Sequence, residues 1–139
     1  MFLYENPLVF PRAFSVKKIQ ILNSDKQVLE ALGNASLENL KNIAFINAQS
    51  IPSSFPKIVS LSRASFSIEK YESDNLEINL NNSPQPSFLV ITNSFSPFWQ
   101  CFIDGTESQI IPTNHAFWGV LVPPKSKKII LRYNPPYQF

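Results

Sequence analysis

Short apolar segments separated by turn residues dominate the larger, C-terminal part of the chain. Apolar and polar side chains alternate over residues 76–80, which predicts a half-buried strand. Residues 88–91, Phe-Leu-Val-Ile, are apolar on both faces and predict a central strand. Asp104 and Gly105 form a strong signal for a two-residue hairpin turn. The spacing of these segments predicts an antiparallel, jelly-roll-like β-sandwich over residues 57–139.

Composition agrees with a fold built from strands and loops. The chain has 12 Pro and only 3 Gly, whereas typical proteins contain more Gly than Pro. A change of parity in one predicted strand also indicates a bulge near Ser62 and Arg63. The further predicted strands cover residues 59–71, 99–103, 106–111, 117–122 and 127–133.

A helical signal is confined to residues 1–56. Ser24 is a good N-cap, Gln27 stands at the capping-box position, Val28, Leu29 and Leu32 form one apolar face, and Gly33 is a natural stop. Residues 36–41 predict a second short helical turn. Strands are predicted before and after the helices, over 12–22 and 42–47, and a connector rich in Ser and Pro follows at 48–57. We expect this strand-helix-strand portion, residues 1–56, and the sandwich, residues 57–139, to form one compact, mainly β (α+β) domain.

Several classes of function are disfavoured by composition. Charged residues make up only 16% of the chain and the net charge is +2, so we expect no nucleic-acid partner. Cys101 and His115 are the only residues of their types, which leaves too few good ligands for a metal site. The three glycines are scattered, so no phosphate cradle and no cofactor are expected.

We also expect no catalytic centre. The single histidine lies in a Pro-Thr-Asn-His loop without a nucleophile elbow. The only acids of the C-terminal third are Asp104 and Glu107, and the hairpin turn explains Asp104 better than a glycosidase pair does.

The longest apolar stretches are far shorter than the roughly 20 residues that cross a bilayer, and residues 1–7 lack the features of a signal peptide.

Aromatic side chains are the best binding candidates. Flat rings suit stacking on sugars, and Trp99 and Trp118, with the loop residues Asn114 and His115, form the candidate ligand-binding set. Their alternative role is packing in the core. Three lysines form a candidate membrane-facing cluster: Lys125, Lys127 and Lys128. Close to anionic lipid each would contribute roughly 1 kcal/mol of binding free energy. The alternative is that they lie on a solvated turn.

Four segments from both ends of the chain stand out together: Asn6-Pro7-Leu8-Val9-Phe10-Pro11-Arg12-Ala13-Phe14, Ser96-Pro97-Phe98-Trp99-Gln100-Cys101-Phe102-Ile103-Asp104-Gly105, Asn114-His115-Ala116-Phe117-Trp118-Gly119-Val120-Leu121-Val122-Pro123 and Leu131-Arg132-Tyr133-Asn134-Pro135. With them the chain resembles a known family, the YfhO-type membrane proteins of bacteria. These are multi-pass proteins related to glycosyltransferases that use lipid-linked sugars, and the resemblance is to their extracytoplasmic C-terminal domain. The family usually has Gly where Phe98 stands and a Gly-containing turn where Pro124-Lys125-Ser126 stands.

The resemblance implies a non-catalytic accessory domain on the extracytoplasmic face of a bacterial membrane. Such a domain would bind a glycan or lipid-linked sugar, or dock on the transmembrane part of its parent protein, where the catalytic part of the family is expected. The alternative is a free-standing β-sandwich that binds carbohydrate or another protein.

Overall fold

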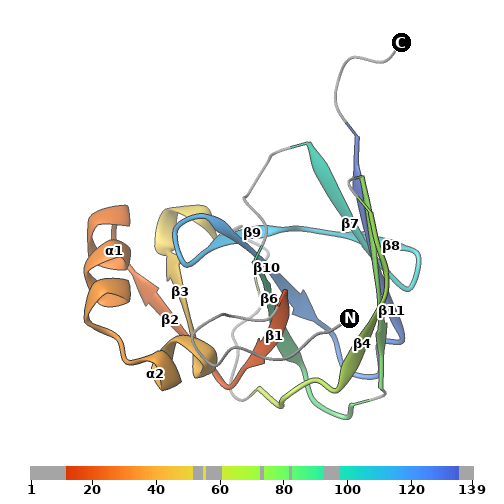
Figure 1. The fold of residues 1–139 in the computed structure, drawn as a ribbon, viewed down its shortest axis with the longest axis horizontal. Coiled ribbons are helices and arrows are strands. Elements are labelled where there is room, and N and C mark those ends of the chain that lie inside the picture. The colour runs from red at the N-terminus through yellow and green to blue at the C-terminus, as the bar shows by residue number, and fades with distance from the viewer. Residues whose placement is uncertain are drawn as a thin grey trace.

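The computed structural model describes residues 12–51, 55, 61–72, 74–81, 83–92 and 98–134. The fold is mainly β and sandwich-like, with antiparallel sheets and a small N-terminal strand-helix-strand part (Figure 1). Residues 6–11, half of the predicted connector and the start of the predicted strand at 59–71 lie outside the described residues. The elements are β1 (Ala13–Val16), β2 (Lys18–Leu22), α1 (Asp25–Asn34), α2 (Leu37–Asn42), β3 (Ile43–Asn47), a 3-10 turn (Ala48–Ser50), β4 (Phe66–Tyr71), β5 (Asn75–Leu80), β6 (Ser87–Ile91), β7 (Trp99–Ile103), β8 (Thr106–Ser108), β9 (Ile111–Thr113), β10 (Phe117–Val122) and β11 (Lys128–Tyr133).

Two antiparallel sheets face each other across the main core. The four-stranded sheet has the order β1-β6-β10-β9, and the five-stranded sheet has the order β4-β5-β11-β7-β8. Alternate residues of each strand point into the space between the sheets, as the period of two requires. The side chains buried there include Leu76, Ile78, Leu89, Val120, Ile129 and Leu131.

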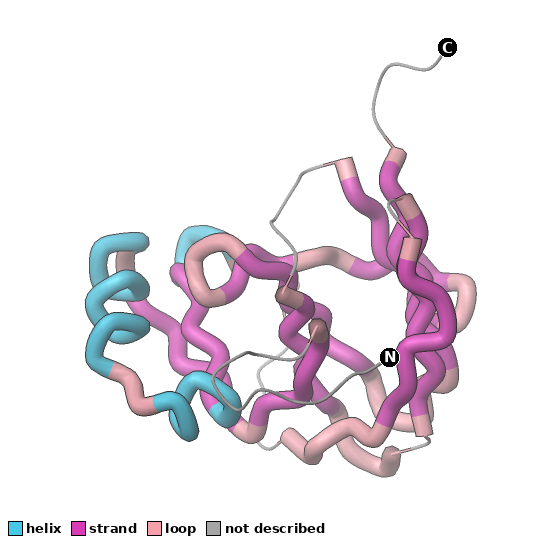
Figure 2. Tube along the Cα trace, in the orientation of Figure 1, coloured by secondary structure: helices cyan, strands magenta, loops and turns pink. Residues whose placement is uncertain are grey.

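The four-stranded sheet is buried on both faces. On the side away from the five-stranded sheet it packs against β2, β3 and the helices, which lie together at one side of the molecule (Figure 2). A second core forms there around Phe14, Val16, Ile46, Phe88 and Val90. Every residue of β6 is buried, which confirms the prediction that this segment is a central strand.

The predicted strand at 12–22 is two strands in different sheets. β1 pairs antiparallel with β6, whereas β2 pairs parallel with β3. The chain turns at Lys17, whose backbone N–H donates to the carbonyl of Asn42 at 2.9 Å. All four residues of β1 are buried, but Lys17 and Lys18 are exposed. The break between β1 and β2 therefore places both lysines in solvent, where the chain leaves the four-stranded sheet.

The helical segment follows its capping signals. The Ser24 hydroxyl accepts from the backbone N–H of Gln27 at 3.2 Å, and the Gln27 side chain accepts from the N–H of Asn23 at 2.8 Å. Val28 is buried, Leu32 is half-buried and Leu29 is 48% exposed, so the apolar face of α1 is only partly covered. The reason is geometric: Val28 is the buried residue of α1, which packs on β3, and the next residue lies about 100° further round the helix.

A bulge and a strand break lie at other positions than the sequence predicts. The register shift occurs between Ile68 and Lys70, inside the β4–β5 ladder, and not near Ser62 and Arg63. The predicted strand at 106–111 divides because β8 pairs with β7, whereas β9 pairs with β10 in the other sheet. Residues 109–110 carry the chain from one sheet to the other.

Asp104 ties the β7–β8 hairpin to the connection between β10 and β11. Its φ is 50° and that of Gly105 is 86°, as a tight hairpin turn with two positive φ values requires. The Asp104 carboxylate accepts hydrogen bonds from the backbone N–H groups of Lys127, at 3.1 Å, and Lys128, at 2.9 Å. The acid at this position therefore has a structural role.

We expect Asp104→Ala to lower the free energy of unfolding by about 2 kcal/mol, because it removes charge-assisted hydrogen bonds and places an alanine at positive φ. Urea unfolding followed by far-UV circular dichroism measures the change. Asp104→Asn retains one acceptor oxygen and tolerates positive φ, so its loss should be about half as large. Equal losses in the two variants would rule out the carboxylate as the source of the stability.

Candidate functional site

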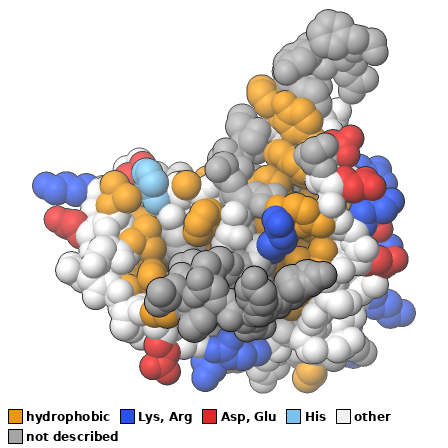
Figure 3. All heavy atoms as spheres, viewed as in Figure 1, with side chains coloured by type: hydrophobic (Ala, Val, Ile, Leu, Met, Phe, Trp, Pro, Cys, Tyr) orange, Lys and Arg blue, Asp and Glu red, His pale blue; other side chains and the backbone are white. Residues whose placement is uncertain are grey.

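Three aromatic side chains gather at one end of the five-stranded sheet. β7 begins with Trp99 and β11 ends with Tyr133, and these two residues are cross-strand partners. Phe98 precedes β7, and its ring meets that of Tyr133 edge-on with centroids 6.5 Å apart, while Trp99 and Tyr133 are 5.7 Å apart. Phe98 and Tyr133 are each 38% exposed and Trp99 is half-buried. We call Phe98, Trp99 and Tyr133 the aromatic rim, and hydrophobic side chains are visible at this end of the molecule (Figure 3).

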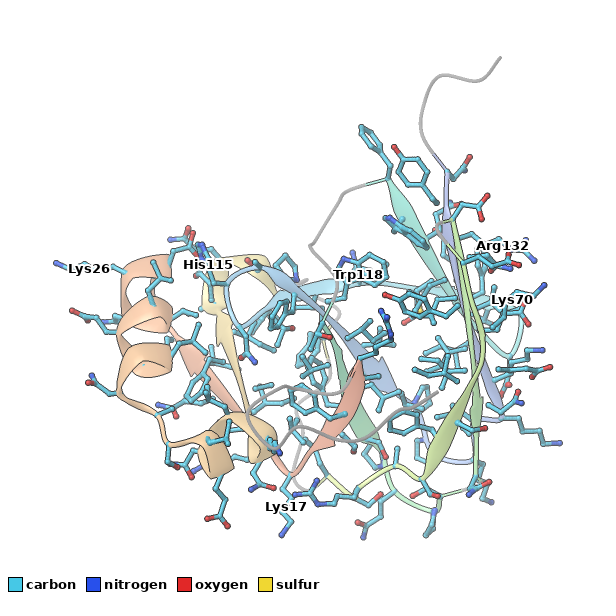
Figure 4. The ribbon with its side chains drawn as sticks, in the orientation of Figure 1. Lys17, Lys26, Lys70, His115, Trp118 and Arg132 are labelled. Carbon is cyan, nitrogen blue, oxygen red and sulfur yellow. The ribbon has the colours of Figure 1, made fainter. Side chains whose placement is uncertain are left out.

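Trp118 supports the rim from inside the sandwich. Its ring centroid lies 4.7 Å from that of Trp99, and its side chain is only 1% exposed. Figure 4 shows Trp118 in the interior, between the two sheets. A ring this buried cannot face a ligand in this conformation. Of the two predicted tryptophans, Trp99 is therefore the one that reaches the surface.

Asn114 and His115 lie in the turn between β9 and β10. The Asn114 Oδ1 accepts from the backbone N–H of Phe45 at 2.8 Å, and the Asn114 N–H donates to the Phe45 carbonyl at 2.8 Å. Asn114 is buried and has a φ of 51°, a conformation that Asn tolerates well. It thus fastens the turn to β3, whereas the exposed His115 lies beside the helices, away from Trp118 (Figure 4). The structure does not bring the four predicted residues into one site.

Polar side chains line the outer face of the five-stranded sheet, opposite to the face of Trp99 and Tyr133. This face, directed away from the core, carries Asn75, Glu77, Gln100, Lys128 and Arg132, because their strand neighbours such as Leu76 and Leu131 point inward. Arg132 stands between two amides, with Asn75 as its cross-strand partner on β5 and Gln100 on β7.

The amide of Gln100 is part of a chain of hydrogen bonds beside the rim. Its Oε1 accepts from the Nδ2 of Asn134 at 3.0 Å, and its Nε2 donates to Glu107 at 3.3 Å. The Asn134 backbone N–H donates to the carbonyl of Phe98 at 2.7 Å. The two amides are therefore connected to the backbone of Phe98, at the edge of the rim. Sequence reasoning missed these polar residues, and the signal that could have found them is their alternation with buried residues on β7 and β11.

The lysines of the predicted membrane-facing cluster have different surroundings. Lys128 lies on the outer face, where its Nζ is 3.1 Å from Glu77 and 3.8 Å from Glu69. The hydrogen bond from Lys128, followed by that from Asn75, lowers the pKa of Glu77, and the bond to Glu77 raises the pKa of Lys128. Lys125 and Lys127 are exposed on the turn before β11. Of the three lysines in the cluster, these two have no carboxylate partner among the described residues.

Cys101 is in the main core and fully buried. Burial raises the pKa of its thiol to about 12, so it stays protonated and is a poor nucleophile. Within the described residues no three His, Cys, Asp or Glu side chains are arranged to hold a metal ion. None of the helices in the same residues has the length and apolar character that a membrane span requires.

Comparison of the chain with protein-family models, with curated proteins and with solved structures finds no match.

Proposed function

We propose that this is a non-catalytic binding domain that holds a glycan on the aromatic rim. The observation that carries the proposal is the exposure of Phe98 and Tyr133, 38% each, in a cluster whose third ring is braced by a buried tryptophan. Exposed aromatic clusters are informative because large apolar rings are normally buried in a sandwich. Flat rings cover the apolar face of a pyranose with little entropy to lose.

The polar neighbours support a sugar over a purely apolar ligand. Asn134 bonds to the Phe98 backbone and to the Gln100 amide, which places amide donors and acceptors at the edge of the rim. Few and well-placed polar groups next to an apolar platform are typical of small-molecule sites. A hexose-binding site needs an aromatic ring on which the sugar stacks and polar groups that hydrogen-bond its hydroxyl groups.

The resemblance to the YfhO-type membrane proteins supports a wider setting for this activity. In that setting the domain is an accessory part of a glycosyltransferase-like membrane protein. It lies on the extracytoplasmic face of a bacterial membrane and presents a glycan or lipid-linked sugar to the membrane-embedded part. The domain performs no reaction itself.

Isothermal titration with a panel of cell-wall glycans tests the proposal. We expect saturable binding of at least one glycan by the wild-type domain, and an affinity about tenfold lower for Phe98→Ala and for Tyr133→Ala, because each loses one stacking surface. Leu29→Ala is the matched control, since Leu29 is also an exposed apolar residue but lies on α1. Its affinity should equal that of the wild type.

A wild-type domain that binds none of the glycans would overturn the proposal, and so would rim variants that bind as tightly as the control. The second candidate function is docking on the transmembrane part of a parent protein or on another protein. It is favoured by apolar side chains exposed on the strand-helix layer, Ile21 at 51%, Leu29 at 48% and Leu37 at 40%.

A further inference from the structure

We infer that the glycan is a neutral oligosaccharide that extends from the aromatic rim to a second contact, the pair of Arg12 and Tyr71. This inference rests on the proposed function and names the class of its ligand. It starts from the part of the five-stranded sheet that the four-stranded sheet does not cover.

Tyr71, the last residue of β4, lies on the same face of the five-stranded sheet as Trp99 and Tyr133. Tyr71 is the cross-strand partner of Leu76, and Leu76 is the partner of Leu131. Leu131 and Tyr133 share one parity on β11, and Tyr133 is the partner of Trp99. This face is the inner one, because Leu76 and Leu131 belong to the main core. The strand register therefore connects Tyr71 to the rim along one face.

The four-stranded sheet covers this inner face only up to a row marked by two contacts. At one end of the row, the guanidinium of Arg12 lies over the Tyr71 ring, 4.1 Å from its centroid. At the other end, Trp118 meets Trp99 with ring centroids 4.7 Å apart. The two contacts belong to one row of the four-stranded sheet, because β1 begins opposite Ile91 of β6 and Trp118 also pairs with Ile91.

Beyond that row the inner face is accessible. Figure 1 shows β7 and β11 continuing past β6 and β10. Tyr71 is 40% exposed, similar to Phe98 and Tyr133, although rings on the inner face of a sandwich are normally buried. Two strand spacings and two residues separate Tyr71 from Tyr133, which amounts to roughly 12 Å between their backbones. One hexose cannot bridge this span, whereas a short chain of sugars can.

Arg12 supplies hydrogen-bond donors at the far end of this span. Its carbonyl accepts from the backbone N–H of Thr92 at 2.9 Å, and its side chain makes no ion pair within the described residues. An aromatic ring attracts a guanidinium placed over it, and the planar fork of N–H donors remains available at the edge of the cation. The exposed acids Glu72 and Asp74 follow β4 and offset the positive charge. Neutral hydroxyl groups therefore match this contact better than an anionic group does.

Isothermal titration with two neutral series tests the inference: chitooligosaccharides and maltooligosaccharides, each from the disaccharide to the hexasaccharide. We expect the wild-type domain to bind the hexasaccharide of one series about tenfold more tightly than the disaccharide, because only the longer chain reaches both contacts. Tyr71→Ala should abolish this preference and leave the affinity for the disaccharide unchanged. Phe98→Ala should weaken the binding of both sugars, since both contact the rim.

Further variants separate the ring from the guanidinium. Tyr71→Phe keeps the ring and should keep the preference for the hexasaccharide, whereas Arg12→Gln should reduce it about threefold. Arg132→Gln is the matched control, because Arg132 lies on the opposite, outer face of the same sheet. It should bind both sugars as the wild type does. The fraction folded, checked by circular dichroism, should be the same for all variants.

Three results would overturn the inference. If the disaccharide and the hexasaccharide bind equally, with an affinity that falls in Phe98→Ala, the proposed function stands and the second contact is wrong. A preference for the hexasaccharide that persists in both Tyr71→Ala and Arg12→Gln would also exclude this pair of residues from the site. If no member of either series binds, the inference is wrong for neutral glycans, and the panel of cell-wall glycans decides separately whether the proposed function stands.

Discussion

Trp118→Ala is expected to lower the free energy of unfolding by about 4 kcal/mol, the largest single loss among the residues considered for ligand binding. The Trp118 side chain is only 1% exposed and belongs to the core between the two sheets. Its ring braces Trp99 at 4.7 Å, so the truncation opens a cavity and also removes the support of the aromatic rim. The cost combines lost apolar transfer energy with the cavity that remains.

Urea unfolding followed by far-UV circular dichroism gives this change directly. Trp118→Phe should lose about half as much, because it keeps an aromatic ring in the site. Leu29→Ala is an exposed control on α1 and should change stability by less than about 0.5 kcal/mol. A loss of less than about 1 kcal/mol in Trp118→Ala would be incompatible with a fully buried ring.

Gly119→Ala is expected to destabilise the protein by about 3 kcal/mol through overpacking. Gly119 is in β10, between β6 and β9, and it is the cross-strand partner of Val90 and Ile111. A Cβ at this position would lie 2.1 Å from Thr113 Oγ1 and 2.5 Å from the ring of Phe88. Both neighbours are completely buried, so neither can move aside without disturbing the second core.

The same substitution at Gly33 is the control for this prediction. A Cβ at Gly33, in α1, would have no atom within 4 Å. Gly33→Ala should therefore stabilise the protein by about 0.5–1 kcal/mol, since alanine restricts the unfolded chain and favours the helix. Thermal unfolding of both variants measures the contrast. If the two changes had the same sign, the close packing around Gly119 would be refuted.

Local sequence signals were sufficient to predict most of the helices and strands. The capping residue Ser24 marks the start of α1, the Asp104-Gly105 pair marks a hairpin, and an all-apolar segment identifies β6 as the central strand. Each of these features depends on neighbours within a few residues, which is why it can be recognised without the fold. The break at Lys17 could not, because no Pro or Gly marks it and it follows from two strands joining different sheets.

The candidate site, too, could be predicted only in part from the sequence. Trp99 was a candidate from its residue type alone, but the roles of Trp118 and Asn114 depend on what packs against them. Parity along β7 places Trp99 and Cys101 on one face, yet Cys101 is fully buried and Trp99 only half-buried. The surroundings of Arg132 likewise come from strands far apart in the chain.

By itself, then, the sequence determined that this protein is a β-sandwich with a small capped helical part, because alternation and capping are local physics. Which aromatic rings reach solvent and which lysines pair with a carboxylate were decided only by the tertiary structure. Side-chain period tells which residues share a face. It does not tell where the opposing sheet ends or which strand lies alongside.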